Sequence, residues 1–423
     1  MSSPLLSYAQ AAEVVAARAA QLAVQRLAAE TVQLSAAPGR ILAQPLLADA
    51  DQPPFTRSTR DGYACRAAEV SRHQFLPIAG ATRAGDAPSG PLPHDSAWEI
   101  MTGAPLPEGA DCVVMVEHVE AADGAVRLLP PRTIAPGDNI VPRAAQARQG
   151  DALVPAGVRI TYAHIALAAS CGSASLQVFR RPRVAILTTG DELVPIDAVP
   201  TPGQIRNSND PMLAVLVADA GGDPWILPTA ADNEQSLDAA LQQAAQADML
   251  LISGGVSAGK FDLVEPALAR IAAQFHFTGI RIQPGKPLVF GETQISAPEA
   301  SSPANRSLPF FGLPGNPVSS AVTFLLFATP ILAALAGAAS SGPHFALAQL
   351  SADTDRRAKP GLTRFLPAFC DFSPSASQLP QVALVPWQGS GDLAAQARSN
   401  CFLVIPEEIA SLSAGETVRI LLS

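Results

Sequence analysis

The spacing of hydrophobic residues separates the chain into helical, strand-like and mixed stretches. Residues 5–30 place Ala, Val and Leu on one helical face, which predicts an amphipathic helix followed by a short strand and a proline-rich loop. From about 75 to 146, short apolar runs are broken by Gly and Pro, which is typical of a small β-rich module without a long helix.

A regular alternation of strands and helices begins at RVAIL, residues 183–187, after a helix predicted over 161–170 behind a threonine cap. The elements predicted next are the helix 210–220, the strand WILPT, the helix 234–247, the strand MLLISGG and a strand at 310–313. This order predicts a mostly parallel sheet with helices on both faces. After about 341 the pattern becomes strand-rich again, which predicts a C-terminal β module.

Residues 318–339 carry no charge over a length sufficient to span a membrane. The segment follows a Gly-Pro-Asn loop, contains Pro330 and has no Lys or Arg close to its ends. We therefore predict a buried helix of the α/β layer, and no membrane partner. Residues 296–308 are small, polar and unpatterned, which predicts an exposed insertion.

Composition narrows the classes of function. The 423 residues, which predict two to four domains, are 48% hydrophobic and 15% charged, with a formal net charge of -9. No basic run exceeds two residues, so a nucleic-acid partner is not expected, and an anion would be bound locally by backbone N–H groups and single cations. The five cysteines are far apart and lack CxxC spacing, which favours a reducing, cytoplasmic location over disulfides or zinc.

The segment SGGVSAGKFD, residues 253–262, is the strongest candidate site. A buried strand ends in Ser253-Gly254-Gly255, where missing side chains let backbone N–H groups approach a ligand. Ser257 adds a hydroxyl and Asp262 a carboxylate. We interpret the loop as a site for an anionic, phosphorylated ligand, the alternative being a plain βα turn.

Two further loops have stiff backbones suited to an anion. In PGKP, Pro284 and Pro287 lie on either side of Lys286. The two prolines restrict the backbone, so the lysine can be held facing an anion with little further loss of conformational entropy. In GLPGNP, Asn316 and Pro317 form an N-cap and first-turn pair, so the helix that follows would present free N–H groups. Each loop taken alone is equally well explained as a turn.

Several other polar residues beside glycines suit the wall of a cleft. In TTGDEL, residues 188–193, Glu192 follows a Gly turn at the carboxyl end of a strand, and either contacts a substrate or makes a structural hydrogen bond. Asp61 and Thr102 lie beside glycines in loops of the first half. The six histidines show no spacing that predicts a transition-metal site or a catalytic triad.

Six short motifs follow one another along the chain. They are RDGYA at 60–64, TGAPLPEGAD at 102–111, TTGDEL at 188–193, ISGGVSAGKFD at 252–262, PGKP at 284–287 and GLPGNPVS at 312–319. In this order and spacing they resemble the molybdopterin molybdenumtransferase family, known as MoeA in bacteria and as the E domain of gephyrin. The resemblance spans almost the whole chain.

The resemblance implies an elongated homodimer with four domains per chain. The expected domains are an N-terminal elongated helical domain at 1–48 with 147–178, a β-rich inserted module at 49–146, a MogA-like molybdopterin-binding α/β domain at 179–340 and a barrel-like C-terminal β domain at 341–423. Enzymes of this family bind adenylylated molybdopterin and molybdate, release AMP with Mg²⁺, and leave molybdenum on the dithiolene. The resemblance also implies other proteins of molybdenum cofactor biosynthesis as partners.

The resemblance also implies roles for individual residues. Asp232 and Asp262 match the acids that handle magnesium and the pyrophosphate. The other residues implied in catalysis are Asp61, Thr102, Glu192 and Lys286, with Asp61 and Thr102 supplied by the second subunit. The residues implied in binding adenylylated molybdopterin or molybdate are Ser253, Gly254, Gly255, Ser257, Pro287, Pro314, Gly315, Pro317, Ser319 and Ser390.

At several positions the sequence departs from the family pattern. The residues that replace an expected acid, lysine or arginine are Gln146, Lys260, Gly279, Gln283 and Pro367. Losing two or three cations weakens capture of a dianion, and Lys260 and Arg281 are expected to compensate in part. Three hypotheses follow: an active molybdenumtransferase with a rearranged anion pocket, a catalytically impaired paralogue that binds molybdopterin or pairs with an active homologue, and a transferase for another oxyanion such as tungstate.

Overall fold

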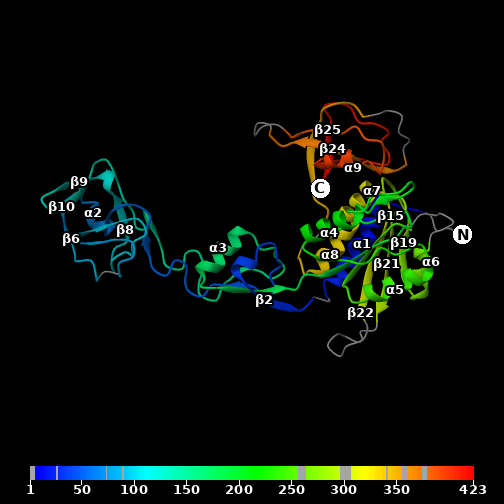
Figure 1. The fold of residues 1–423 in the computed structure, drawn as a ribbon. Helices are drawn as coiled ribbons and strands as arrows, with labels where there is room; N and C mark the ends of the chain where they lie inside the picture. The colour runs from blue at the N-terminus through cyan, green and yellow to red at the C-terminus, as the bar shows by residue number, and fades with distance from the viewer. Residues whose placement is uncertain are drawn as a thin grey trace. The chain divides into compact units, whose positions relative to one another are not determined.

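The computed structural model describes residues 5–24, 27–72, 74–87, 90–255, 263–295, 306–339, 342–354, 361–373 and 379–423. The chain divides into two compact units (Figure 1). The first comprises Met1–Ala43, Gly157–Ile160 and Gln177–Ser423, and the second comprises Gln44–Ala156 and Thr161–Leu176. The four domain boundaries expected from the sequence remain a prediction.

A mostly parallel sheet forms the centre of the first unit, as predicted. Its strand order is β17 (Asp223–Ile226), β14 (Arg183–Thr188), β18 (Met249–Ser253), β22 (Arg306–Leu313), β21 (Val289–Ile295) and β19 (Gln274–Thr278). The first four strands are parallel, and β21 and β19 are antiparallel to their neighbours. All of β18 and nearly all of β14 is buried, because helices cover both faces of the sheet.

The helices divide between the two faces of this sheet. One face packs against α1 (Tyr8–Leu22), α4 (Asn209–Asp219), α7 (Pro317–Thr323) and α8 (Thr329–Leu335). The other face packs against α5 (Glu234–Ala244) and α6 (Val264–Arg270). In α5 the buried residues Leu237, Leu241 and Ala244 recur at helical spacing, and Asn233 caps the helix by accepting from Ser236 N at 2.9 Å.

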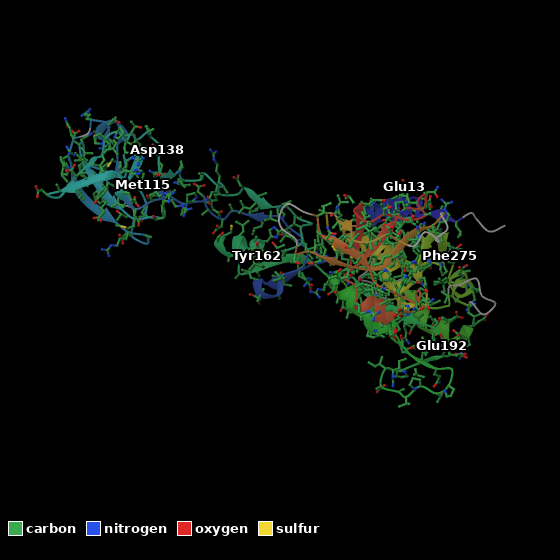
Figure 2. The ribbon with its side chains drawn as sticks, turned by 90° about the horizontal axis from the view of Figure 1, so that it is seen from above. Glu13, Met115, Asp138, Tyr162, Glu192 and Phe275 are labelled. Carbon is green, nitrogen blue, oxygen red and sulfur yellow. The ribbon has the colours of Figure 1, made fainter. Side chains whose placement is uncertain are left out.

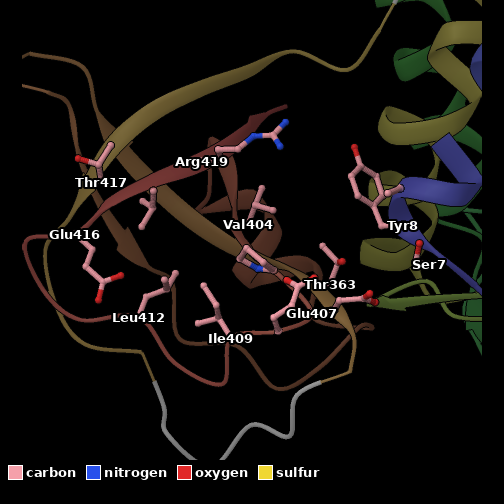
Figure 3. Close-up of a pocket in the computed structure, with 14 residues that line it drawn as sticks. Ser7, Tyr8, Thr363, Val404, Glu407, Ile409, Leu412, Glu416, Thr417 and Arg419 are labelled. Carbon is pink, nitrogen blue, oxygen red and sulfur yellow. The ribbon is translucent and has the colours of Figure 1, made fainter. Parts of the chain in front are cut away.

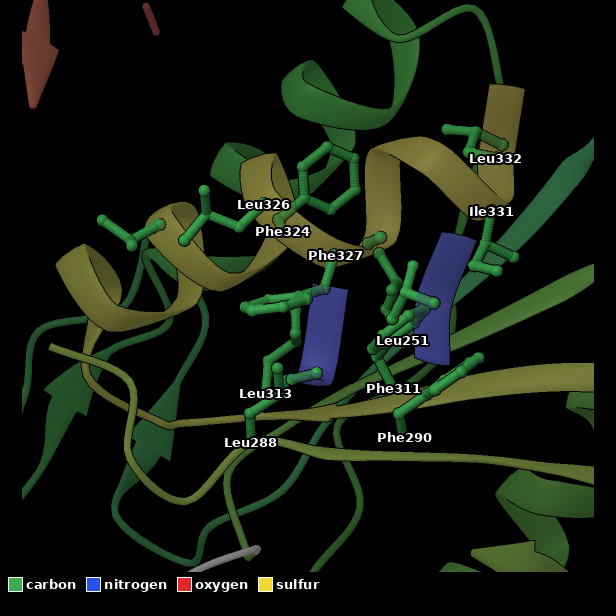
Figure 4. Close-up of a cluster of buried hydrophobic side chains, with 14 of the residues drawn as sticks. Leu251, Leu288, Phe290, Phe311, Leu313, Phe324, Leu326, Phe327, Ile331 and Leu332 are labelled. Carbon is green, nitrogen blue, oxygen red and sulfur yellow. The ribbon is translucent and has the colours of Figure 1, made fainter. Parts of the chain in front are cut away.

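The uncharged segment is a core helix. Residues Pro317–Leu335 are helical throughout, with a π-helical segment at Phe324–Ala328, and 89% of the apolar window is buried inside the structure. Phe324 and Phe327 point into the main hydrophobic cluster, where Phe290 stacks on Phe311 with ring centroids 4.5 Å apart (Figure 4). Burial among these rings explains the absence of charge from the segment.

The C-terminal module is a closed barrel. Its strands are β24 (Thr363–Asp371), β25 (Gln381–Leu384), β23 (Phe345–Leu350), β27 (Thr417–Leu422) and β26 (Cys401–Ile405), and β26 pairs again with β24. Strand β24 also pairs with β20 (Ile280–Gln283), which in turn pairs with β1 (Leu6–Ser7). The short helix α9 (Leu393–Ala397) lies between β25 and β26 along the chain.

The helix predicted over residues 5–30 is shorter at both ends. Leu6 and Ser7 pair with β20, and the Ser7 side chain caps α1 by accepting from Gln10 N at 3.2 Å. After α1, β2 (Ala29–Gln33) pairs with β13 (Ser175–Phe179). Pairing with strands far away in the sequence thus replaces helix at both ends, although the residues fit a helical pattern.

The second unit contains a sheet of order β8-β5-β7-β6-β10-β9. Its strands are β5 (Gly62–Cys65), β6 (Leu76–Thr82), β7 (Ala97–Ile100), β8 (Cys112–Met115), β9 (Val119–Ala122) and β10 (Ala125–Leu128). Smaller elements are α2 (Ala67–Val70), α3 (Tyr162–Ser170) and the pairs β3–β12 (Leu46–Leu47, Ala152–Val154) and β4–β11 (Arg57–Ser58, Ile140–Val141). In the described part of 75–146, the only helix is the one-turn segment Val116–His118, which confirms the prediction of a β-rich module.

Candidate functional site

Three parallel strands of the central sheet end level with one another. Thr188, Ser253 and Leu313 are in register as the last residues of β14, β18 and β22. The ladder continues one residue further, because Thr189 N donates to Ser253 O at 3.1 Å and Gly254 N donates to Leu313 O at 3.2 Å. The glycine-rich loops singled out in the sequence are therefore neighbours at the edge where α/β sheets bind ligands.

Glycine is required at this edge by both conformation and space. Gly254 has φ +97°, and a Cβ there would lie 2.6 Å from Thr189 O. Gly255 also has a positive φ, of +62°. A Cβ on Gly315 would lie 3.5 Å from Gly254 Cα, so the two loops nearly touch. Ser257, Lys260 and Asp262 lie outside the described residues, and their predicted roles remain predictions.

A buried network of asparagine side chains supports this edge, and sequence reasoning missed it. Asn209 Nδ2 donates to Ser253 Oγ at 2.8 Å and to Gly315 O at 2.7 Å. Asn207 Nδ2 donates to Thr188 Oγ1 at 2.8 Å and to Asp210 Oδ2 at 2.6 Å. The run RNSND before the predicted helix is an unusual concentration of polar residues, and it was the available signal.

Three polar atoms of this region are buried without a hydrogen-bond partner among the described residues. They are Thr189 Oγ1, Asn209 Oδ1 and Asp210 Oδ1. Burial raises the pKa of Asp210 to about 6, and hydrogen bonds from Thr188 and Asn207 oppose the rise. Buried polar atoms of this kind are normally satisfied, so unpaired ones beside the glycine loops are suited to contact a ligand.

Acidic side chains follow β14 at the same edge. Gly190 has φ +145°, and a Cβ there would lie 2.6 Å from the Glu192 carboxylate, which Figure 2 labels. Asp191 Oδ1 accepts from Asp232 N at 3.0 Å. The pKa of Asp232 is raised, first by partial burial and then by the charges of Asp191 and Glu192, although a backbone hydrogen bond lowers it. In the described residues no group of three or more His, Cys, Asp or Glu is arranged to hold a metal ion.

The PGKP loop lies against helix α7. Gly285 has φ +111°, and a Cβ there would lie 2.5 Å from Thr323 Cγ2, one helical turn after Ser319. Lys286 is exposed, and its carbonyl accepts from Ile280 N at 2.9 Å. Ser319 is buried, Pro317 begins α7, and Pro314 and Pro287 flank the two loops. The loop that carries the predicted Lys286 therefore packs against α7, the helix that carries the predicted Ser319.

Ser390 reaches α7 from the C-terminal module. Its carbonyl accepts from Val318 N, and its hydroxyl accepts from Asn316 Nδ2, both at 3.0 Å. Asn316 is at the N-cap position as expected, but its side chain makes no capping hydrogen bond to the helix. The sequence predicted free N–H groups at the start of this helix. That prediction is wrong for Val318, whose N–H already donates to the Ser390 carbonyl.

Asp61 and Thr102 belong to the second unit and contact each other there. Asp61 Oδ1 accepts from Thr102 N and from Thr102 Oγ1, each at 2.7 Å. These two hydrogen bonds, the backbone one first, lower the pKa of Asp61. The carboxylate is therefore held ionised in a fixed orientation, and its participation in the site remains a prediction.

The substituted positions have distinct surroundings. Gly279 has φ +90°, and a Cβ there would lie 2.7 Å from Leu5 Cδ2, so a lysine at this position would strain the backbone and displace the Leu5 side chain. Gln283 is exposed at the end of β20, and Pro367 pairs with Phe402 inside the barrel. Gln146 lies in the second unit, where its N–H donates to Gln52 O. Arg281 forms an ion pair with Glu407 at 3.3 Å, so its charge is already balanced and compensates less than expected.

A cavity of about 400 Å³ lies elsewhere in the first unit, between the start of α1 and the barrel (Figure 3). Tyr8, Glu407 and Arg419 are among its lining residues. Burial raises the pKa of the Tyr8 hydroxyl, and the charge of Arg419 opposes the rise. The cavity lining includes none of the site residues predicted from the sequence, so we do not assign it to the same chemistry.

Comparison with known proteins gives matches along the chain. The MoeA N-terminal region (domain I and II) matches residues 6–172, a probable molybdopterin binding domain matches 185–334, and the MoeA C-terminal region (domain IV) matches 349–423. The molybdopterin molybdenumtransferase of Haemophilus influenzae is 34% identical over 92% of this chain and 93% of its own length. That of Bacillus subtilis is 33% identical over 93% of this chain and 89% of its own.

Solved structures agree with these sequence matches. Two crystal structures of the molybdopterin biosynthesis MoeA protein from Pyrococcus horikoshii align with TM-scores of 0.73 and 0.79. Their sequence identities are 30% and 26%; each alignment covers 99% of this chain, and 99% and 100% of those chains. From the near-complete alignment with relatives at least 30% identical and the successive family matches, we conclude that the chain belongs to the molybdopterin molybdenumtransferase family.

Proposed function

We propose that the chain inserts molybdenum from molybdate into adenylylated molybdopterin, with magnesium-dependent release of AMP. A place in molybdenum cofactor biosynthesis as a transferase follows from the relatives. The structural observation that carries the proposal is the level ending of β14, β18 and β22, which gathers the Gly254 and Gly315 loops beside α7. Unpaired buried polar atoms at that edge support a bound polar ligand.

The residues divide into a phosphate-binding part and an oxyanion-binding part. Ser253, Gly254 and Gly255 lie at the strand end, where N–H groups can approach a pyrophosphate, and Ser257 is proposed to add a hydroxyl donor. Lys286 with Ser319 and Ser390 holds molybdate, because a compact dianion is bound by a cation and hydroxyl donors. AMP leaves when water cleaves the phosphoanhydride bond between the pterin phosphate and the adenylate.

The acidic residues suit a hard divalent cation. Partial burial, and after it repulsion from Asp191 and Glu192, raises the pKa of Asp232, and a cation bound at this carboxylate would relieve that repulsion. Mg²⁺ commonly uses one or two carboxylates and completes its shell with substrate phosphates and water, so Asp232 with Asp262 is a sufficient protein contribution. A bound Mg²⁺ would neutralise charge on the phosphoanhydride oxygens.

Assembly and location follow the same resemblance. A homodimer is proposed, in which Asp61 and Thr102 of the second subunit complete the cleft, and other proteins of the pathway are proposed partners. The five cysteines are free and buried thiols, which supports a cytoplasmic location.

The experiment follows AMP release by purified protein given adenylylated molybdopterin, Mg²⁺ and molybdate. Wild-type protein should release AMP only when molybdate is present. Asp262→Ala should abolish release, and Asp232→Asn should lower it and raise the Mg²⁺ requirement by roughly 10- to 100-fold. Asp238→Asn removes an equal charge from the exposed α5 surface, where it pairs with Arg270, and should leave release unchanged.

The contrary outcome identifies the other hypothesis. Wild-type protein that binds adenylylated molybdopterin but releases no AMP on addition of molybdate would be a non-catalytic binding paralogue. Release driven by tungstate and not by molybdate would instead reassign the oxyanion.

A further inference from the structure

Ser390 lies at the tip of a loop that its own neighbours hold rigid. Asp392 Oδ2 accepts from Gln388 N and Oδ1 accepts from Ala395 N, both at 2.9 Å, so one carboxylate closes the loop and caps α9. Asp392 N donates to Gly389 O at 3.0 Å. Trp387, just before the loop, packs against the main hydrophobic cluster. The position of Ser390 is therefore set by both ends of its loop.

Two contacts attach this loop to the start of helix α7. The Ser390 carbonyl accepts from Val318 N, which would otherwise be one of the unpaired N–H groups of the first helical turn. The Ser390 hydroxyl oxygen accepts from Asn316 Nδ2 at 3.0 Å. A Cβ on the adjacent Gly391 would lie 3.6 Å from Asn316 Oδ1, so the loop lies along the Asn316 amide.

The second contact determines which way the hydroxyl can donate. A serine hydroxyl has one hydrogen to donate and two lone pairs to accept. Because Asn316 Nδ2 donates to Ser390 Oγ, it uses one lone pair of this oxygen and leaves the hydroxyl hydrogen free to donate elsewhere. In the described part of the chain, no residue accepts that hydrogen.

We propose that Asn316 is a positioning residue for the molybdate pocket: its amide donates to Ser390 Oγ and so commits the Ser390 hydrogen to the oxyanion. This inference rests on the proposed function, in which Ser390 contacts molybdate. It gives Asn316 a role other than helix capping, in agreement with the lack of a capping bond from its side chain. Ser390 comes from the C-terminal module and Asn316 from the start of helix α7, so the C-terminal module supplies the donor and the central sheet domain orients it.

The decisive variant is Asn316→Asp, which keeps the shape of the side chain but replaces the donor by an acceptor. Ser390 would then donate its hydrogen to the introduced carboxylate, turning its lone pairs towards the oxyanion beside a new negative charge. Molybdate binding, measured by titration calorimetry on the full chain without pterin, should weaken by roughly 10- to 100-fold. The affinity for adenylylated molybdopterin should change less than about threefold.

Asn316→Ala separates orientation from charge. The Ser390 hydroxyl becomes free to rotate, and molybdate binding should weaken by roughly three- to tenfold. The double variant Asn316→Ala with Ser390→Ala should bind molybdate no more weakly than Ser390→Ala alone, because Asn316 acts through that hydroxyl. Asn400→Ala, which removes two hydrogen bonds to Cys370 in the same module, should leave molybdate binding unchanged.

Molybdate affinity equal to wild type in Asn316→Asp would overturn the proposal, as would additive losses in the double variant. A loss of affinity for molybdate and adenylylated molybdopterin alike in Asn316→Ala would also overturn it, by showing a general structural role. These titrations need no turnover, so they are independent of whether wild-type protein releases AMP. Failure of the proposed function and failure of this inference are therefore distinguishable.

Discussion

Asn209 and Ser253 join the first residue of helix α4 to the last residue of strand β18. The bond runs from Asn209 Nδ2 to Ser253 Oγ over 2.8 Å, and Asn209 is 9% exposed and Ser253 2% exposed. The same nitrogen reaches Gly315 O at 2.7 Å, so one amide ties together three segments that surround the predicted pyrophosphate site.

Replacement of that amide should affect stability and substrate binding together. Asn209→Ala removes both hydrogen bonds and should lower the free energy of unfolding by about 2 kcal/mol, at about 1 kcal/mol for each bond. The KM for adenylylated molybdopterin should rise at least about fivefold, because the Gly315 loop loses its support. Urea unfolding and AMP-release kinetics measure the two effects.

Asn400→Ala is the matched control for that variant. Asn400 also makes two hydrogen bonds, accepting from Cys370 N at 2.7 Å and donating to Cys370 O at 2.8 Å, inside the barrel. A similar loss of stability with an unchanged KM is expected. An equal rise of KM in both variants would show that the effect of Asn209 is only general destabilisation.

The close approach at Gly254 predicts a large effect of a single methyl group. Gly254→Ala places Cβ 2.6 Å from Thr189 O at φ +97°, whereas Gly203→Ala has φ +91° with no atom within 4 Å. Both variants incur the cost of a left-handed backbone, about 1–2 kcal/mol, and only the first meets the carbonyl. Urea unfolding should show Gly254→Ala less stable than Gly203→Ala by at least about 1 kcal/mol. Equal stabilities of the two variants would mean that the backbones at Thr189 and Gly254, just after β14 and β18, can move apart without cost.

The raised pKa of Asp210 predicts that the difference in stability between wild type and Asp210→Asn depends on pH. Its pKa rises from 3.8 to about 6 on folding because it is buried, so the folded protein holds this proton more tightly than the unfolded chain. Ionisation between pH 4 and 6 therefore lowers wild-type stability, and above that window the loss is constant. The free energy of unfolding of Asp210→Asn relative to wild type should rise through this window, by less than about 3 kcal/mol because solvent screens this partly buried carboxyl.

Unfolding curves at pH 4, 5, 6 and 7 measure this gain. Asp219→Asn, exposed at the other end of α4, is the control for the loss of one negative charge. A constant difference between Asp210→Asn and wild type from pH 4 to 7 would contradict the buried-carboxyl explanation.

Lysine is expected from the family pattern at positions 283 and 279, and restoring it should have opposite effects at the two positions. Gln283 is exposed beside the PGKP loop, so Gln283→Lys adds a cation near Lys286 and should lower the KM for molybdate by roughly tenfold. Gly279→Lys places a side chain against Leu5 at φ +90° and should destabilise the fold without lowering that KM. A KM that does not fall in Gln283→Lys would show that residue 283 does not face the oxyanion.

The local pattern of apolar runs and glycines was sufficient to predict the central sheet and the edge of it where the loops lie together. Buried runs such as Met249–Ser253 are followed by glycine, and the order of strands and helices specifies a mostly parallel sheet. The asparagine network was not predictable in this way, because Asn209 and Ser253 are 44 residues apart and a hydrogen bond between them has no periodic signature. Asn316 shows the same limit, since its partner Ser390 is 74 residues away.

The ends of the first helix were missed for a related reason. Helical spacing of Ala and Leu in residues 5–30 is a local property, whereas pairing of Leu6 with Ile280 depends on the completed tertiary structure. Tertiary pairing outweighed a weak helical preference at both ends of α1 (Tyr8–Leu22).

Strand β24 has a consequence for the order in which the protein is made. Residues Thr363–Asp371 pair with β20 at one end and with the barrel at the other, and they leave the ribosome after the whole central sheet. Until then the β20 edge beside the PGKP loop has no β24 to pair with, and Ser390 has not been synthesised. A chain that stalls before β24 would expose this edge to other nascent chains, so completing translation both protects the protein from aggregation and assembles the proposed anion pocket.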